Sequence, residues 1–242
     1  MRKTVAAVAA LAVLTFASVA NAAVLVRTYT LDTTEVAGFN SEFPSGNFGT
    51  VTVTDNGVDL YISVALADGL EFRNSPDNQH NDLTFDLKNN GVQDNTRTLS
   101  NFTDNVTPHV FFQAVGNSFN NQPFSGFNYA VDCTAGSKHS AGCTTGWNPT
   151  HNPTTMGFKV AGVSINEIAS VPYTPPNSHT AKNIFFAVDV VNRFGNTGAI
   201  GATWNGFTYS YAPEPGAWAL LILGFGCIGA DLRRRRKAAL AA

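Results

Sequence analysis

The sequence predicts an all-β fold, an antiparallel, jelly-roll-like β-sandwich, between an N-terminal signal peptide and a single C-terminal membrane helix. Three observations support this prediction. Hydrophobic and polar residues alternate in some ten short runs, Gly, Asn and Asp separate these runs, and no run between residues 23 and 211 has a convincing helical period. About 190 residues are ample for one hydrophobic core, so we expect one domain over residues 23–211.

The first 22 residues have the organisation of a secretory signal peptide. A positively charged start, Met1-Arg2-Lys3, precedes an apolar region over residues 5–19, and Ala20-Asn21-Ala22 fits the small-x-small cleavage rule. We therefore expect cleavage between Ala22 and Ala23. The alternative is an uncleaved N-terminal anchor.

The clearest strands lie in the first third of the domain. Residues 25–31 form one alternating run, residues 50–54 a second and residues 58–66 a third. Asp55-Asn56-Gly57 separates the second from the third and is a tight-turn signal, so these two runs should form a hairpin.

The later runs are shorter and more interrupted. Residues 184–191 are apolar on both faces except at Asp189, which predicts a central, buried strand. A slip in the alternation at Gly162 predicts a β-bulge, and Pro172 to Pro176 should break the chain. Residues 117–128, rich in Asn, Ser, Gly and Phe, should be irregular. Further strands are expected at residues 83–87, 110–114, 127–131, 158–165 and 207–211.

Two of the three cysteines are spaced for a disulfide. Cys133 and Cys143 flank a nine-residue loop, and in an oxidising compartment we expect them to form a bridge. Closing a loop of this length stabilises a domain by about 2–3 kcal/mol on the chain-entropy model. Cys227 lies in an apolar stretch and is expected to be a packing residue.

The charge of the exported domain excludes one class of partner. Between residues 23 and 211 there are 8 Lys and Arg and 15 Asp and Glu, a formal charge near −7, although the whole chain reads −2. A nucleic-acid binder would need a basic face, so no nucleic acid is expected as a partner.

Polar clusters leave cation and glycan binding open as alternatives. Asn and Asp supply the oxygen ligands that suit Ca²⁺, but they also form turns by bonding their own backbone, and we favour turns and expect no metal or other cofactor. Exposed aromatic residues in Asn-rich loops could stack on sugar rings, although they could equally cap the domain ends. The oxygen-rich group comprises Asp77, Asn78, Asn81 and Asp82 in one loop and Asp55, Asn56 and Asp59 in another, and the aromatic group comprises Phe119, Phe124 and Trp147.

Catalytic motifs are absent from the sequence. The five histidines, at positions 80, 109, 139, 151 and 179, form no His-x-His or His-x-x-x-His pair, and there is no Gly-x-Ser-x-Gly elbow or phosphate-binding Gly-rich loop. We therefore expect no enzyme and no catalytic residues. A clustered, partly buried pair of carboxylates in the structure would favour an enzyme instead.

Three kinds of segment follow one another after residue 211. The prolines of Pro213-Glu214-Pro215 favour an extended backbone. Residues 216–230 carry no charge. A dense basic cluster follows, formed by Arg233, Arg234, Arg235, Arg236 and Lys237. As a helix, the uncharged stretch would be about 22 Å long, a short span for a bilayer core of about 30 Å. Trp218, Tyr209 and Tyr211 fit an aromatic belt, and the basic cluster fits the cytoplasmic side.

This order of Pro-Glu-Pro, Gly-Ala-Trp-Ala, apolar helix and Arg run resembles the PEP-CTERM sorting signal in its Pro-Glu-Pro-x-x-Trp-Ala subtype. The resemblance covers residues 212–237, with the motif at 213–215, a transmembrane helix at about 216–232 and the basic cluster at 233–237. It implies that Pro213, Glu214, Pro215 and Trp218 are read by exosortase, a membrane-embedded, sortase-like processing enzyme of Gram-negative bacteria that make exopolysaccharide. The alternative is a plain C-terminal anchor with a proline hinge.

The two ends of the chain predict one topology. The signal peptide sends the N-terminus through the Sec export machinery, and Arg233 to Arg236 hold the C-terminus in the cytoplasm, so the precursor spans the inner membrane once and transiently. We expect an exported cell-surface or extracellular-matrix protein, a structural or adhesive component of a biofilm associated with extracellular polysaccharide. The alternative is a lectin-like glycan-binding module.

Overall fold

A computed structural model describes residues 23–73, 80–106, 112–115, 119–133, 142–176 and 178–211, together with residues 224–226, 228–229 and 233. The chain divides into two units. Leu25–Tyr209 forms the domain described below, and Met1–Val24 with Ser210–Ala242 forms the second unit.

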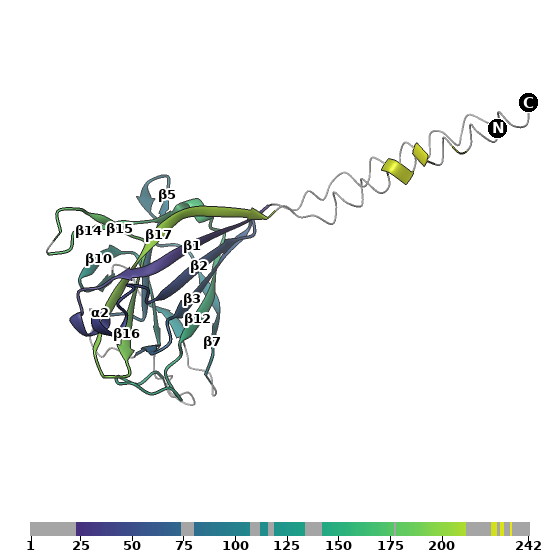
Figure 1. The fold of residues 1–242 in the computed structure, drawn as a ribbon. Coiled ribbons are helices and arrows are strands. Elements are labelled where there is room, and N and C mark those ends of the chain that lie inside the picture. Colours follow the sequence, from purple (N-terminus) through teal and green to yellow (C-terminus); the bar gives the residue numbers. More distant parts are fainter. Residues whose placement is uncertain are drawn as a thin grey trace, which may run out of the picture. The chain divides into compact units, whose positions relative to one another are not determined.

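The domain is built almost entirely of strands (Figure 1). The helical elements among the described residues of the domain are α2 (Ala37–Glu42) and one 3-10 turn, η1 (Ile165–Glu167). In chain order the strands are β1 (Val24–Thr33), β2 (Gly49–Asp55), β3 (Asp59–Leu66), β4 (Leu70–Phe72), β5 (Leu83–Asn89), β6 (Val92–Gln93), β7 (Leu99–Asp104), β8 (Phe112–Val115), β9 (Phe119–Asn121), β10 (Phe124–Phe127), β11 (Tyr129–Cys133), β12 (Thr155–Ala161), β13 (Ile168–Ala169), β14 (Val171–Tyr173), β15 (Lys182–Ile184), β16 (Phe186–Asn192) and β17 (Thr197–Tyr211).

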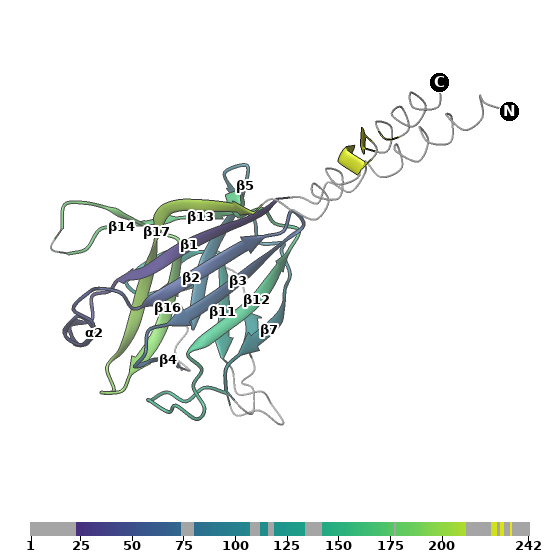
Figure 2. The same ribbon diagram turned by 45° about the vertical axis from the view of Figure 1, so that its right-hand side comes forward.

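Most of the described strands form one large, curled, mainly antiparallel sheet. Thirteen strands belong to it, along the path β7-β12-β3-β2-β1-β17-β16-β5-β11-β8 with β4, β6 and β13 attached at its sides. The two ends of this path, β7 and β8, lie near each other. A twisted sheet of many strands coils instead of staying flat, and Figure 2 shows the curl. The prediction of an all-β antiparallel fold is therefore confirmed, but the layers that face each other are parts of one sheet instead of the two sheets of a jelly-roll sandwich.

The predicted hairpin of β2 and β3 is confirmed. Gly49 pairs with Leu66 and Asp55 with Leu60, and the turn between the strands is closed by Asn56 and Gly57. Along β2, buried and half-buried residues alternate from Gly49 to Asp55, so one face of the hairpin lies on the core. The alternation in the sequence therefore fixes both the pairing and the orientation of these strands.

The interior of the curled sheet holds the main hydrophobic core. It includes a group of aromatic rings, among them Phe85, which stacks on Tyr129 at 5.2 Å between ring centroids. Strand β16 is buried along its whole length, as the apolar run of residues 184–191 predicts. Its neighbours are β17 and β5, so it lies inside the sheet and not at an edge.

Two small hairpins form a second, smaller cluster around β16 and β17. Strand β9 pairs with β10, and β14 pairs with β15. Phe124 and Val171 from these hairpins pack with Ala187 and Ala199 of the large sheet. The prediction that residues 117–128 are irregular is thus wrong for β9 and β10. The predicted chain break does not begin at Pro172, because this proline lies in β14, which pairs with β15.

The bulge predicted at Gly162 is instead a strand end. Gly162 has φ +65°, and the chain turns there from β12 into η1. Ser164 and Glu167 form a capping box at η1, with the Ser164 side chain accepting from the Asn166 backbone N–H. The change of phase in the sequence marks the turn because residues 163 and 165 no longer belong to the strand.

The predicted disulfide between Cys133 and Cys143 is confirmed. The two Cα atoms lie 5.6 Å apart, within the range for a bridge, and both cysteines are buried. The bridge ties the end of β11 to the segment before β12.

The tail is described at few positions. Residues 224–226, 228–229 and 233 are helical, and Arg233 is exposed. No helix among the described residues has both the length and the apolar composition needed to cross a membrane. The predicted signal peptide, with Ala22 at its end, lies outside the described residues, and so do Pro213, Glu214, Pro215, Trp218, Arg234, Arg235 and Arg236.

Candidate functional site

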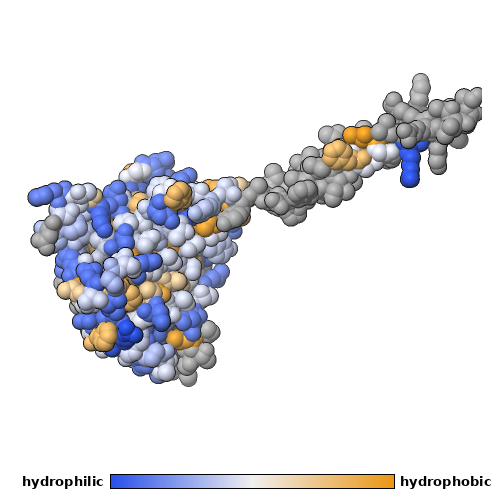
Figure 3. Space-filling model, in the orientation of Figure 1, coloured by the Kyte–Doolittle hydropathy of each residue, from blue (hydrophilic) through white to orange (hydrophobic). Residues whose placement is uncertain are grey.

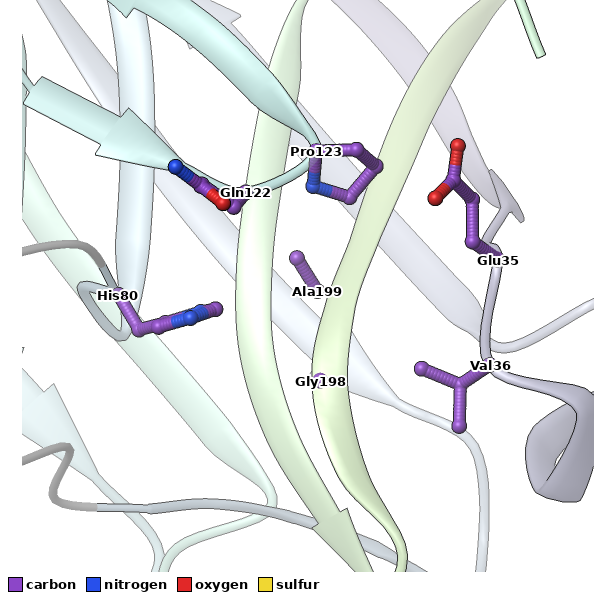
Figure 4. Close-up of a pocket in the computed structure, with 7 residues that line it drawn as sticks. All are labelled: Glu35, Val36, His80, Gln122, Pro123, Gly198 and Ala199. Carbon is purple, nitrogen blue, oxygen red and sulfur yellow. The ribbon is translucent and has the colours of Figure 1, made fainter. Parts of the chain in front are cut away.

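A pocket of about 320 Å³ opens over β17 between three loops (Figure 4). Gly198 and Ala199 of β17 form its floor, while polar side chains stand on both sides, with His80 on one side and Glu35 on the other. The lining residues are Glu35, Val36, His80, Gln122, Pro123, Gly198 and Ala199. Convergent polar groups around a floor of small residues make this the strongest candidate for a binding site.

Glu35 is held over the floor by the segment between β1 and α2. The Thr34 hydroxyl donates to the carbonyl oxygen of Ala199 at 3.0 Å and accepts from the Val36 backbone N–H at 3.2 Å. The Tyr173 hydroxyl donates to Glu35 Oε1. Burial, and then the bond to the Glu35 carboxylate, raise the pKa of Tyr173 above its ordinary value.

Gln122 and Pro123 reach the pocket from the turn between β9 and β10. The neighbouring Asn121 is buried, and its side-chain amide donates to the carbonyl oxygens of Asn81 at 2.8 Å and Ala187 at 3.0 Å. These bonds fasten the hairpin to the large sheet. The Gln122 amide is therefore carried on an anchored turn.

Behind His80 lies a buried carboxylate. Asp189 of β16 contacts Arg73 through Oδ2, 2.9 Å from the guanidinium Nε, and its Oδ1 lies 4.0 Å from His80 Nδ1. The latter distance is too long for a hydrogen bond. Asp189 thus lies next to both His80, which lines the pocket, and Arg73, two residues that flank residues 74–79 in the chain.

A second buried carboxyl group, that of Asp82, lies near Asp189, and the half-buried Asp132 lies next to Asp82. The Asp82 backbone N–H donates to Asp132 Oδ1 at 3.2 Å, and Asp82 Oδ2 accepts from the Cys133 backbone N–H. Burial raises the pKa of Asp82 well above its ordinary value, and the charges of Asp132 and Asp189 add to this effect. Burial also raises the pKa of Asp132 to about 6.

We expect the domain to lose stability as the pH rises from about 4 to above 6. The folded-state pKa of Asp132 is about 6, against 3.8 for the free group, so the folded state binds this proton more tightly than the unfolded state does. Its contribution is complete below about pH 4 and is lost as the pH rises through 6. The loss should be about 2 kcal/mol, reduced for the partial exposure of Asp132. Urea unfolding at pH 4.5 and pH 7.5 measures it.

Asp132→Asn is the control for this pH dependence. The amide oxygen can still accept from the Asp82 N–H, but it cannot titrate, so the difference in unfolding free energy between the two pH values should shrink. The pKa values of Asp82, Glu71 and Asp86 are raised as well, so these groups keep part of the slope in the variant. An unchanged slope in Asp132→Asn would contradict the assignment.

Asp82 and Asp132 form a clustered, partly buried pair of carboxylates of the kind that would favour an enzyme, but they do not lie in the pocket. Asp82 and Asp132 are absent from its lining, and the hydrogen bonds described above direct them to backbone N–H groups. Within the described ranges, no three His, Cys, Asp or Glu side chains are grouped so that they could hold a metal ion.

Asp55, Asn56 and Asp59 form turns, as favoured from the sequence. Asp55 accepts from the backbone N–H groups of Gly57 and Ile165, and Asn56 accepts from that of Asp59. Asp59 contacts the Lys159 ammonium at 3.1 Å. A hydrogen bond from the Gly162 backbone and then the Lys159 contact lower the pKa of Asp59. The other oxygen-rich group is divided, with Asn81 and Asp82 buried and Asp77 and Asn78 outside the described residues.

The three predicted sugar-stacking aromatics do not form one site. Phe124 is buried in the second hydrophobic cluster, which is the capping role named as the alternative. Phe119 and Trp147 are half-buried, and neither lines the pocket. Of the histidines, His80 lines the pocket, His151 and His179 are exposed elsewhere, and His109 and His139 lie outside the described residues.

Sequence reasoning missed Glu35 and Gln122. Glu35 lies between two elements, and Gln122 lies in a segment expected to be irregular, so no periodic pattern or motif marks either residue. They come together because Glu35 follows β1, the neighbour of β17 in the sheet, and because the hairpin of β9 and β10 packs on β17.

No protein-family model, curated protein or solved structure matches this chain.

Proposed function

We propose that this chain is an exported protein of the cell surface or extracellular matrix, sorted by its C-terminal segment and serving as a structural or adhesive component beside exopolysaccharide. The observation that carries this proposal is the order of Pro213-Glu214-Pro215, an uncharged stretch and a basic cluster. In the proposed precursor, residues 216–232 form the membrane helix and a membrane-embedded exosortase reads the motif before the tail is lost.

The domain has properties that suit an extracellular component. It contains a disulfide, which persists in oxidising compartments. The face shown in Figure 3 is mostly hydrophilic, with hydrophobic residues scattered over it. These properties support export and an extracellular location, and the proposed role is non-catalytic.

Glu214→Ala should make the uncleaved precursor accumulate in the inner membrane. Glu214 is the one charge of the motif, and a processing enzyme would have to pair it with a donor. Residues 212–216 are proline-rich, so the substitution should leave folding intact. Immunoblots of membrane and released fractions after a pulse of synthesis measure the ratio of precursor to product, which we expect to rise at least roughly tenfold, the effect of losing one charge-assisted bond.

Asp68→Ala is the matched control, since it removes an exposed carboxylate in the turn after β3, far along the sequence from the motif. It should be processed like the wild type. If Glu214→Ala is also processed and released at the wild-type rate, the motif is a hinge and the plain anchor is the correct reading.

The pocket favours glycan binding as a second candidate function. Glu35, Gln122 and His80 offer a carboxylate, an amide and an imidazole around a floor of small residues, a set that suits a ligand with many hydroxyl groups. The test is a pull-down of the full-length protein in detergent with exopolysaccharide purified from the producing bacterium. Gln122→Ala should weaken retention, whereas Asn120→Ala, an exposed change on the same hairpin outside the pocket, should not. Equal retention of both variants would exclude the pocket.

A further inference from the structure

The last strand of the domain exposes three aromatic side chains. Trp204 is 40% exposed, Phe207 63% and Tyr209 51%, although all three belong to β17. We call these three residues the aromatic strip. Three large aromatic residues exposed within six residues of one strand are unusual for a soluble surface and mark an interaction site.

The strip is exposed because β17 is longer than its neighbour β16. Pairing between the two strands begins at Phe186, opposite Ala202, and β17 continues to Tyr211. Gly206, with φ +86°, interrupts the regular alternation, and the Asn205 side chain accepts from the Phe207 backbone N–H at 3.1 Å. The Trp204 indole N–H donates to the Phe207 carbonyl oxygen at 3.0 Å, so the indole is directed along the strand towards Phe207.

The strip is locally uncharged and has a cation beside it. Residues 203–211 contain no Asp, Glu, Lys or Arg, in a domain with a formal charge near −7. Arg27 of β1 lies over the Trp204 ring at 4.8 Å and donates to the Thr208 hydroxyl at 3.2 Å. The carboxylate of Asp32 lies at the other end of residues 203–211 and accepts a hydrogen bond from the Thr203 hydroxyl at 2.6 Å.

Another exposed apolar side chain belongs to the same end of the sheet. Val58, in the turn between β2 and β3, is 69% exposed. Leu25 pairs with Asp55, which places this turn beside the start of β1. The Arg27 guanidinium in turn donates to the carbonyl oxygen of Ile165, whose N–H bonds Asp55.

The position of the strip in the chain selects its partner. Tyr209 precedes Gly216, where the uncharged stretch begins, by seven residues, which span at most about 25 Å when fully extended. A membrane that holds residues 216–232 is therefore always within reach of the strip. Trp and Tyr are the residues that favour the membrane–water interface, because their rings are apolar and their N–H or O–H groups are polar.

We propose that the aromatic strip docks on the membrane–water interface while the tail is inserted, with the Trp204, Phe207 and Tyr209 rings among the lipid headgroups and Arg27 beside the phosphates. The proposal rests on the proposed function, since it needs the tail in the membrane. Docking holds the end of β17 at the membrane surface, so that the Pro-Glu-Pro motif two residues after Tyr211 is presented to an enzyme in the lipid.

The test uses Trp204 as the only tryptophan of the full-length chain. The sequence has three tryptophans, so Trp147→Phe with Trp218→Phe leaves Trp204 as the single probe. The protein is reconstituted into phosphatidylcholine–phosphatidylglycerol vesicles with and without bromine on the acyl chains near the headgroups. We expect the brominated lipid to reduce Trp204 emission roughly twofold, because an interfacial ring lies about 5–10 Å into the headgroup–acyl boundary.

A matched control places the tryptophan at the opposite end of β17. Phe194 lies in the turn between β16 and β17, is 69% exposed and has Arg193 over its ring at 5.1 Å, so it resembles the Trp204–Arg27 pair. With Trp204→Phe and Phe194→Trp added to the same background, the brominated lipid should leave the emission unchanged.

Alkaline extraction of the same vesicles separates two failures. If the protein stays in the membrane but Trp204 is not quenched, the docking proposal is wrong and the anchor stands. If alkali releases the protein, the proposed anchor fails and the docking fails with it. Trp204 emission that responds to dissolved exopolysaccharide, or to protein concentration, but not to brominated lipid would assign the strip to a glycan or to a second copy of the chain and would overturn the proposal.

Discussion

Gly49→Ala is expected to lower the free energy of unfolding of the domain by about 3–5 kcal/mol, from backbone strain and overpacking together. Gly49 opens β2 with φ +137°, a conformation that residues with a side chain rarely adopt. A Cβ there would lie 2.3 Å from the Ala65 carbonyl oxygen and 2.9 Å from the Leu66 Cα. Both atoms belong to the backbone of β3, so they can move only if the β2–β3 pairing opens. Urea unfolding followed by tryptophan fluorescence measures the change.

Gly91→Ala is the control for the strain alone. Gly91 also has a positive φ of +82°, but a Cβ there would have no atom within 4 Å. The cost should be about 1 kcal/mol, the usual penalty for a side chain in this conformation. Equal destabilisation by the two substitutions would mean that the contact with β3 does not matter.

The early strands could be predicted because each of them has one buried face. In β2 and β3 the alternation of apolar and polar residues and the Asp55-Asn56-Gly57 turn determine strand limits, pairing and register together. Strand β16 could be recognised in a different way, because a strand covered on both sides must be apolar on both sides.

The curl of the sheet and the hairpin of β9 and β10 could not be predicted in this way. The curl depends on the twist accumulated over many strands, which no single run of residues records. Strands β9 and β10 are three and four residues long, and Phe119, Asn120 and Asn121 show no period over so short a distance. The hairpin is held by bonds from the buried Asn121 side chain to residues far away in the sequence.

The pocket was beyond sequence reasoning for the same reason. His80 is one of five histidines that form no pair in the sequence, and Asp189 is the one polar residue of the apolar run 184–191. Their proximity is a consequence of the order β16–β5 in the sheet, since β5 begins just after His80. The single polar residue in an apolar strand was a signal that it needed a partner in the core.

Asp189→Ala should lower the free energy of unfolding by about 3–5 kcal/mol, because it takes away the carboxylate that Arg73 contacts and leaves a guanidinium in a largely buried position. The Arg73 side chain is 13% exposed and the Asp189 side chain is fully buried. Urea unfolding at pH 7.5 measures the loss, and Asp68→Ala, which removes an exposed carboxylate, should change the unfolding free energy by less than about 0.5 kcal/mol.

Replacing both partners separates the cost of an unpaired charge from the value of the pair. Arg73→Met with Asp189→Leu should be more stable than Asp189→Ala alone, because apolar side chains of similar volume do not have to be paired. If Asp189→Ala has the same unfolding free energy as the wild type, the Arg73 guanidinium is solvated in the variant, and the ion pair does not hold residues 73 and 80 in place. If instead the single variant is unstable and the double variant recovers, Asp189 holds Arg73 in place. The double variant can then be tested in the pull-down with exopolysaccharide. If it is folded but no longer retained, binding in the pocket requires His80 beside the buried Asp189 carboxylate as well as a folded domain.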